Sequence, residues 1–286
     1  MFGRKREGSV ICAFCGVLVG VNDERCYNCN RRNPGLWGYG PVLRALGQDF
    51  GFIPFVMGTC VILWGLTLVA SRGNIGMGGM FTLLSPSQLA MFIFGASGAG
   101  PVFGDGRWWT VLSAGWLHWG VLHLVFNMMA LRQMGPAAVE LYGPGRTAII
   151  YTAGSVAGFA LSSFAGAYLP PLLFLTGAPI TAGASAPIAG LIGAIYHYGN
   201  RGGSTAARSY ATSYILAMVM YALFLRGIDN YAHAGGLAGG YLAAVYLDPL
   251  KPERIGHLLF GLFCIAISLL AVLVSVLSIV RLTIGS

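Results

Sequence analysis

Residues 167–198 read AYLPPLLFLTGAPITAGASAPIAGLIGAIYHY, an apolar run that four prolines interrupt. A continuous helix does not tolerate this density of prolines, because each one removes a backbone donor and clashes with the preceding turn. The first half therefore predicts an extended loop, and the second half predicts a short helix that begins near Ser185. Pro187 fits the first turn of that helix, where its missing N–H costs nothing. A helix of about 15 residues is too short to cross a bilayer alone and needs a protein-lined polar cavity at its start.

The composition of the whole chain places this run in a membrane. Of its 286 residues, 56% are hydrophobic and 9% are charged, whereas about a quarter of the residues in a soluble domain are charged. This composition excludes a soluble enzyme, a disordered chain and a disulfide-rich secreted domain, and it predicts a polytopic helical membrane protein. Besides the broken run, apolar stretches of spanning length lie near 52–70, 111–132, 147–168, 209–225, 231–247 and 257–280.

The positions of lysine and arginine predict how these spans are oriented. With seven spans and the N-terminus inside, most of the 17 cations fall on the inner side, as the positive-inside rule requires. The exceptions are Arg72, Arg107, Arg226 and Arg281. Leu83–Phe94 is apolar but too short to span, and it predicts a re-entrant or interfacial element. We therefore expect the N-terminus in the cytoplasm and the C-terminus outside, and the net charge of +8 gives no reason to expect nucleic acid.

Residues 1–45 predict a separate cytosolic module and linker ahead of a membrane domain over 46–286. Two CxxC pairs, ten residues apart, are formed by Cys12, Cys15, Cys26 and Cys29. Four thiolates suit tetrahedral zinc, and a module this small needs such a staple. Gly16 and Asn30 follow the second cysteine of each pair, where a knuckle turn needs positive φ. Two disulfides or a redox pair are the alternatives, but disulfides do not persist in the cytosol. The module's role stays open between binding a cytosolic protein partner, regulation and tethering.

The polar residues inside the spans are the main functional signal, because such groups are costly in hydrocarbon. The spans hold no facing pair of carboxylates and no HExxH motif, which sets aside aspartyl and zinc intramembrane proteases. What remains is His118, His123, Asn127, Ser185, His197 and His233.

The helical rise of about 1.5 Å per residue places three of these groups at a similar depth near the outer leaflet. They are His123, His233 and Ser185, and Asn127 shares one helical face with His123. A nucleophilic serine needs an adjacent base, which His233 can supply. His123, Asn127 and the backbone N–H of Ser185 can stabilise an oxyanion. Asp229 precedes His233 by four residues and is expected to cap its helix rather than to join a triad.

The motifs of residues 107–247 resemble those of the rhomboid intramembrane serine proteases. Residues 118–127, HWGVLHLVFN, resemble the family's HxxxxHxxxN motif, and residues 183–186, GASA, resemble its GxSx motif. Residues 232–236, AHAGG, resemble its AHxxG motif. Gly135 and Glu140 resemble the glycine and glutamate that close the second span in the family.

The resemblance implies a fold, a mechanism and a substrate class. The fold is all-α and polytopic: a six-helix rhomboid core, here with a C-terminal seventh transmembrane helix and the small N-terminal zinc ribbon. The implied mechanism uses Ser185 as nucleophile and His233 as base, His123 and Asn127 as oxyanion donors and His118 as a structural neighbour. It needs no catalytic cofactor. The implied partners are the lipid bilayer and single-span membrane proteins, which are cut near the outer face. With no organelle transit signal, we expect a prokaryotic cell membrane.

Three positions depart from the family pattern. Ala186 stands where the family often has glycine, Ala189 stands where an aromatic residue often packs against the base, and Trp109-Thr110 stands where loop one has a Trp-Arg pair. None of these changes removes a reacting group.

Two other functions remain open. One is a catalytically inactive chaperone or binding protein of the same family. The other is a membrane haem or metal protein with histidine ligands, which would leave the proline-broken approach to Ser185 unexplained.

Overall fold

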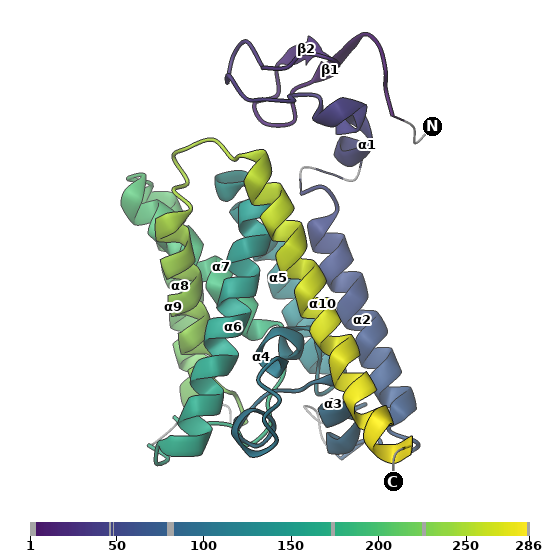
Figure 1. Ribbon diagram of the computed structural model, residues 1–286. Helices are drawn as coiled ribbons and strands as arrows, with labels where there is room; N and C mark the ends of the chain where they lie inside the picture. The colour runs from purple at the N-terminus through teal and green to yellow at the C-terminus, as the bar shows by residue number, and fades with distance from the viewer. Residues whose placement is uncertain are drawn as a thin grey trace.

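A computed structural model describes residues 4–45, 47, 49–78, 83–172, 175–224 and 227–284. Long helices lie roughly side by side in a bundle, with a small two-stranded module at one end and the C-terminus at the other (Figure 1). The module pairs β1 (Ser9–Ile11) with β2 (Leu18–Gly20) in antiparallel register, with Val10 opposite Val19. The single-turn η1 (Leu36–Gly38) and the short helix α1 (Gly40–Ala45) lead from the module towards the bundle.

Within the part of the chain that the structure describes, the bundle contains seven long helices and several short ones. The long ones are α2 (Phe52–Ala70), α5 (Val121–Tyr142), α6 (Pro144–Tyr168), α7 (Ser185–Arg201), α8 (Thr205–Phe224), α9 (Asn230–Tyr246) and α10 (Ile255–Ile284). The short ones are α3 (Gln88–Phe94), η3 (Gly100–Gly104), α4 (Thr110–Ser113) and η4 (Ala114–Trp116). The fold is therefore the all-α arrangement that the composition predicts.

The break in the run 167–198 falls where the prolines predict it. Helix α6 ends at Tyr168, and α7 begins at Ser185 with Pro187 as its third residue. The short apolar stretch at Leu83–Phe94 forms α3, a helix of 7 residues, so the prediction that it is too short to span as a helix is confirmed.

The predicted span over 111–132 is wrong in its bounds. The chain first forms the short α4 and η4, and α5 then begins after Gly120, whose backbone is fully extended, and continues to Tyr142. The apolar run ends at Arg132, but the buried face continues at helical spacing through Met134, Ala138 and Tyr142. Packing of that face, rather than unbroken hydropathy, sets the length of the helix.

Among the described residues, three helices are long and apolar enough to cross a membrane by length and composition: Phe52–Ala70, Pro144–Tyr168 and Ile255–Ile279. Helices α7 and α9 have only 17 residues each. Because α7 is buried along most of its length, its neighbours and not lipid surround it. The apolar helices make this an integral membrane protein, while the count of seven spans stays a prediction.

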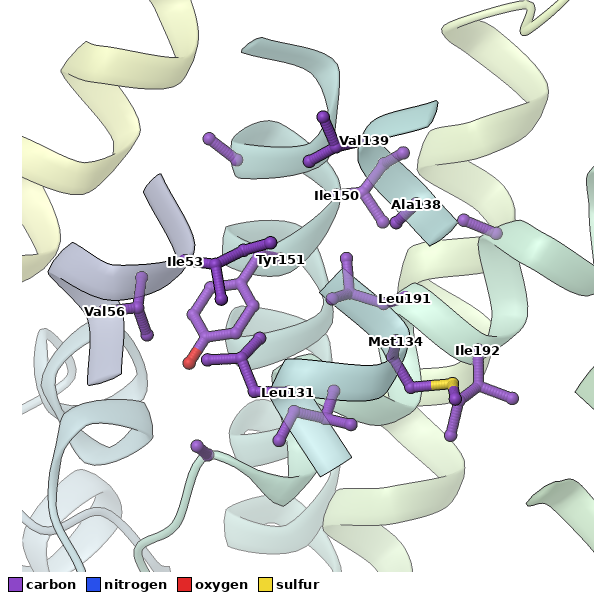
Figure 2. Packing of buried hydrophobic residues seen from close by; sticks show 14 of the residues in the cluster. Ile53, Val56, Leu131, Met134, Ala138, Val139, Ile150, Tyr151, Leu191 and Ile192 are labelled. Carbon is purple, nitrogen blue, oxygen red and sulfur yellow. The ribbon is translucent and has the colours of Figure 1, made fainter. Parts of the chain in front are cut away.

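Helix α7 lies at the centre of the bundle and contacts α5, α6, α8 and α9. Figure 2 shows side chains of α2, α5, α6 and α7 meeting in one buried cluster, among them Val56, Leu131, Ile150 and Leu191. All four are fully buried.

Glycines bring α7 and α9 into backbone contact. A Cβ added at Gly240 would lie 2.1 Å from the carbonyl oxygen of Gly190, and one added at Gly236 would lie 2.2 Å from that of Ala186. No other residue fits at such a separation. Gly236 and Gly240 therefore set the distance between α7, which begins at Ser185, and α9, which carries His233.

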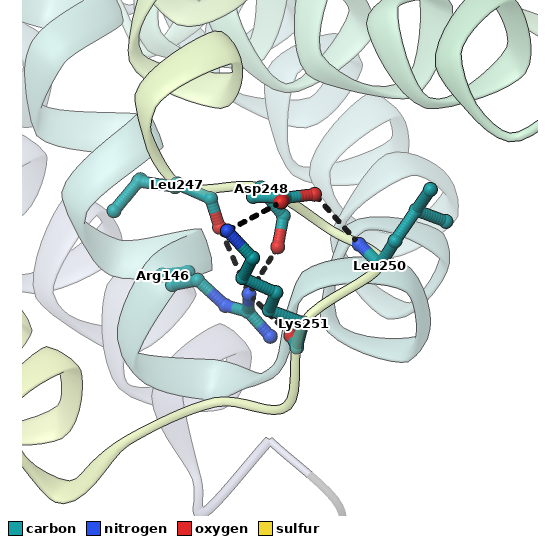
Figure 3. Close-up of polar contacts among 5 residues, drawn as sticks. All are labelled: Arg146, Leu247, Asp248, Leu250 and Lys251. Carbon is teal, nitrogen blue, oxygen red and sulfur yellow. Dashed lines mark hydrogen bonds and ion pairs between the residues drawn. The ribbon is translucent and has the colours of Figure 1, made fainter.

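Buried charges join the module-facing ends of α6 and α9. The Arg146 guanidinium donates to the carbonyl oxygens of Leu247, Asp248 and Lys251 at 2.8–2.9 Å (Figure 3). Glu253 Oε1 accepts the backbone N–H of Arg146 at 2.7 Å and so satisfies a free donor at the start of α6. The end of α9 is thereby attached to the start of α6, and the two helices run antiparallel.

Helix α10 is tied to the short helices on the opposite side of α6. The indole N–H groups of Trp116 and Trp109 donate to the hydroxyls of Ser268 and Ser275, each at 3.0 Å. Arg107, expected on the outer side of the membrane, is 5% exposed and donates to the Ser275 carbonyl at 3.3 Å. The loop ahead of α4 is therefore fixed by α10.

Candidate active site and metal centre

Ser185 is held at the start of α7 by a loop whose backbone is hydrogen-bonded on both sides. Ser97 and Thr181 exchange two backbone hydrogen bonds, at 2.9 and 2.7 Å. Closer to the serine, the Gly183 N–H donates to the Ala114 carbonyl at 3.0 Å, and the Ala184 N–H donates to His118 Nε2 at 3.4 Å. Ser185 itself is partly exposed, whereas its neighbours on both sides are buried. The hydroxyl therefore has a defined position at a rim of the core.

The local geometry of α7 favours negative charge next to Ser185. The first N–H groups of a helix have no partner one turn back, and they carry the positive end of the helix dipole. Pro187 occupies the third position and has no N–H to satisfy. The sequence prediction that the helix begins at the serine is confirmed.

His123 and Ser185 meet at Gly183. A Cβ added at Gly183 would lie 2.7 Å from His123 Nε2 and 3.5 Å from Ser185 Oγ. Gly183 also has φ of +148°, a conformation that side chains disfavour. The glycine thus leaves the space into which both functional groups point, and α5 and α7 each contribute one group to it.

His233 lies in the first turn of α9, three residues before the contact of Gly236 with Ala186. Among the hydrogen bonds of the described residues, none joins Ser185 to His233. Catalytic hydrogen bonds are often longer without substrate and tighten when it binds.

The remaining residues of the histidine motif surround His123. His118 is fully buried, and its ring centroid lies 5.2 Å from that of His123. Its Nδ1 has no hydrogen-bond partner in the described part of the chain. Asn127 is 6% exposed and uses Nδ2 to donate to the His123 carbonyl at 2.9 Å. In this structure the amide steadies the turn that carries His123, and its role as an oxyanion donor stays a prediction.

Asp229 caps α9, as expected from its position. Its Oδ1 accepts the Ala232 N–H at 2.9 Å, and its backbone carbonyl accepts the His233 N–H at 3.1 Å. Its Oδ2 accepts a hydrogen bond of 2.5 Å from the hydroxyl of Ser162 on α6. Sequence reasoning missed Ser162, which the structure shows to be fully buried. The signal that could have identified it is a polar residue within an apolar span.

His197 does not join the site. It lies 12 residues along α7 from Ser185, roughly 18 Å away at the helical rise. Its ring packs edge-on against Tyr241, with the centroids 5.1 Å apart, and it is 8% exposed. A packing role explains this histidine.

The four N-terminal cysteines form a cluster whose geometry fits zinc. The Sγ atoms of Cys12, Cys15, Cys26 and Cys29 all lie within 4.8 Å of one another. The Cys12–Cys29 and Cys15–Cys26 pairs are 3.9 and 3.5 Å apart, and sulfurs around tetrahedral zinc lie about 3.8 Å apart at a Zn–S length of about 2.3 Å. None of the four forms a disulfide. The donor set and its spacing could hold one metal ion.

The two halves of this cluster repeat one turn. The Cys12 carbonyl accepts the Gly16 N–H at 3.1 Å, and the Cys26 carbonyl accepts the Asn30 N–H at 2.9 Å. Gly16 has φ of +80° and Asn30 has φ of +54°, which confirms the prediction of positive φ at both positions. Each turn directs two thiols to the same side.

Comparison with known proteins matches the part of the chain that carries the motifs. The Rhomboid domain family matches residues 105–249, about half of the chain. The chain therefore belongs to the rhomboid family, and the resemblance inferred from its motifs is confirmed.

Three relatives show how far the similarity extends. Rhomboid protease GluP of Bacillus subtilis is 32% identical over 198 residues, which cover 66% of this chain and 37% of GluP. RHOMBOID-like protein 4 of Arabidopsis thaliana is 30% identical over 58% of this chain and 40% of its own length. RHOMBOID-like protein 7 of the same plant is 32% identical over 58% of this chain and 51% of its own length. The alignments thus span between 37% and 51% of the length of these relatives.

Proposed function

We propose that this protein is an intramembrane serine protease that hydrolyses peptide bonds in or near the transmembrane segments of other membrane proteins. The observation that carries the proposal is the convergence of His123 and Ser185 on Gly183, with His233 held against the same helix by the Gly236–Ala186 contact. A partly exposed serine at a helix start, with histidines on two neighbouring helices, is an arrangement suited to acyl transfer. Rhomboid protease GluP, a relative named as a protease, supports the same reaction class.

In the proposed mechanism, His233 removes the proton from Ser185 Oγ as the oxygen attacks the scissile carbonyl carbon. The negative charge that develops on the carbonyl oxygen is stabilised by the Ser185 N–H, His123 and Asn127. His233 then donates the proton to the leaving amine, which leaves an acyl-enzyme. Water, deprotonated by His233, releases the acyl group and regenerates Ser185. His118 supports the ring of His123 and the Ala184 N–H.

We further propose that the active site opens to the outer side of a prokaryotic cell membrane, with the zinc-binding module in the cytoplasm. Because Ser162 near the end of α6 contacts Asp229, α9 begins at the end of the bundle away from Arg146. His233 therefore lies in the half of the bundle remote from the module. The excess of inner cations supports the orientation. Single-span membrane proteins are the proposed substrates, and a cytosolic protein is one proposed partner of the module, beside a regulatory or tethering role.

The test is cleavage of a model single-span substrate by the purified full chain in liposomes. Wild type is expected to cut, whereas Ser185→Ala and His233→Ala are expected to fall to background. Ser213→Ala is the matched control, because its hydroxyl bonds only a carbonyl of its own helix. A fluorophosphonate probe is expected to label Ser185 in wild type and not in Ser185→Ala. Equal cleavage by wild type and both active-site variants would overturn the dyad.

The alternative, a family member that binds spans without cutting them, is favoured by the departures at Ala186 and Ala189 from the family pattern. It makes the opposite prediction for the same experiment. Wild type would bind the substrate without cutting it, and Ser185→Ala would bind it equally well.

A further inference from the structure

We propose that Asp229 and Ser162 form a clamp that positions His233, with Asp229 as a positioning residue and not as a third reacting group. This inference rests on the proposed function, because it concerns the group assigned there as the base. Ser162 belongs to α6 and Asp229 precedes α9 by one residue, so the clamp joins two helices that are far apart in the sequence.

Asp229 makes three contacts, and all of them bear on the first turn of α9. Oδ1 accepts the Ala232 N–H at 2.9 Å, and the backbone carbonyl accepts the His233 N–H at 3.1 Å. Oδ2 accepts the Ser162 hydroxyl at 2.5 Å. The first two contacts shape the turn, while the third fixes the turn to the core, since Ser162 is fully buried.

His233 depends on this turn because only Asn230–Ala232 precede it in α9. The glycine contacts that hold α9 against α7 begin at Gly236, which follows the histidine. Helix ends fray unless side chains satisfy their free N–H groups. Without the clamp, the first turn of α9, which carries the imidazole, would lose both its side-chain cap and its Ser162 hydrogen bond to α6.

Helix α6 can position His233 relative to Ser185, because it packs against both α7 and α9. A Cβ added at Gly158 would lie 2.5 Å from the Ala232 carbonyl oxygen and 2.8 Å from the Ala186 Cβ. Gly158 is one turn before Ser162 on the same face. One face of α6 therefore contacts both Ala186, which follows Ser185, and Ala232, which precedes His233. The hydrogen bond from Ser162 to Asp229 attaches the start of α9 to the same face.

The contacts distinguish a clamp from a catalytic triad. In a triad the carboxylate accepts a hydrogen bond from the imidazole ring of the base. Here both carboxylate oxygens are engaged by Ala232 and Ser162, and the described contacts between Asp229 and His233 run through the backbone. The clamp is proposed to act by fixing the geometry of the turn that carries His233.

The experiment compares Asp229→Ala, Asp229→Asn and Ser162→Ala in the full chain, with Ser213→Ala as the matched serine control. Asparagine caps helices as well as aspartate and can still bond Ser162 through its amide, so Asp229→Asn is expected to keep kcat within about threefold. Asp229→Ala and Ser162→Ala are expected to lower kcat about tenfold with KM within about twofold, because the substrate-binding surface is unchanged. Loss in Asp229→Asn as large as in Asp229→Ala would overturn the clamp in favour of a role for the charge.

A second readout separates this proposal from the proposed function. Backbone hydrogen exchange at residues 230–234 is expected to speed up about tenfold in Asp229→Ala and Ser162→Ala and to stay at the wild-type rate in Asp229→Asn. Unchanged exchange in Asp229→Ala would overturn the clamp even if wild type cleaves substrate. Absence of cleavage by wild type, with the expected exchange pattern, would overturn the proposed function and leave the clamp supported.

Discussion

The Cβ that any residue other than glycine would place at position 183 lies 2.7 Å from Nε2 of His123. This contact makes Gly183 the spacer between the loop that delivers Ser185 and the helix that delivers His123. The position of one imidazole in the proposed site is thus set by the absence of a side chain on another segment.

Gly183→Ala is expected to lower the cleavage rate about 100-fold, since a displacement of about 1 Å in an active site can have that effect. The methyl group must push His123 aside or move the loop at Ser185. Cleavage in liposomes measures the loss. Gly203→Ala is the control, because Gly203 also has positive φ, at +70°, but a Cβ there meets nothing within 4 Å. An equal loss in both variants would assign the effect to backbone conformation alone.

Gly240→Ala is expected to destabilise the bundle by about 1–3 kcal/mol, the usual range for overpacking a core. The added Cβ would lie 2.1 Å from the Gly190 carbonyl oxygen, so α7 and α9 must separate. Thermal unfolding in detergent measures the effect as a lower Tm. Gly58→Ala on α2 adds a Cβ with nothing within 4 Å, and there we expect no loss of stability. A Tm for Gly240→Ala equal to that of Gly58→Ala contradicts the close packing.

Cys12→Ser is expected to remove bound zinc. The substitution leaves three of the four thiolates, and three ligands no longer close a tetrahedral site. Metal analysis of the purified chain should give one zinc per wild-type chain and strongly reduced zinc in the variant. Cys264→Ser is the matched control, as Cys264 is a buried thiol of α10 outside the cluster. Limited proteolysis should then cut within residues 4–45 of Cys12→Ser, since modules of this size unfold without their metal. Full zinc in Cys12→Ser would show that this thiol is no ligand.

Glu253 predicts a pH dependence of stability. Burial raises the pKa of its carboxyl to about 7, against the opposing effects of the Arg146 N–H and of the Arg146 and Arg31 charges. The folded chain therefore binds this proton more tightly than the unfolded chain, whose glutamates titrate near 4.5. It follows that the stability contributed by this group falls as pH rises from about 4.5 to about 7 and is constant above that.

Glu253→Gln removes this slope while its amide oxygen can still accept the Arg146 N–H. The stability of the variant minus that of wild type is expected to be larger at pH 8 than at pH 5. The difference in Tm between the two proteins at each pH measures the effect. A difference that does not change with pH would mean that Glu253 is already ionised at pH 5 in the folded chain.

Most of the fold could be predicted from the sequence because its signals are local. Proline density places the start of α7 at Ser185, and helical periodicity and hydropathy locate α2, α6 and α10. The knuckle turns at Gly16 and Asn30 follow from backbone sterics. The span near 111–132 was misplaced because its hydropathy ends at Arg132, while the face that packs against α7 continues to Tyr142.

The partners of the site residues could not be predicted from the sequence. Nothing local links Ser162 to Asp229, which are joined across 67 positions. Similarly, the burial of Arg107 depends on Ser275, which lies 168 positions further along the chain. Side-chain hydrogen bonds of this kind exist only after the helices have packed, so no periodicity or motif reports them.

The sequence by itself determined the class of this protein. Few charges, the proline-broken run and three short motifs define a membrane protein of the rhomboid family, because the cost of polar groups in hydrocarbon restricts where such residues can stand. Tertiary structure decided how near the groups lie to one another. Backbone contact at Gly236 and Gly240, the space at Gly183 and the Ser162–Asp229 bond are set by helix packing, and the distances on which the proposed chemistry depends follow from that packing alone.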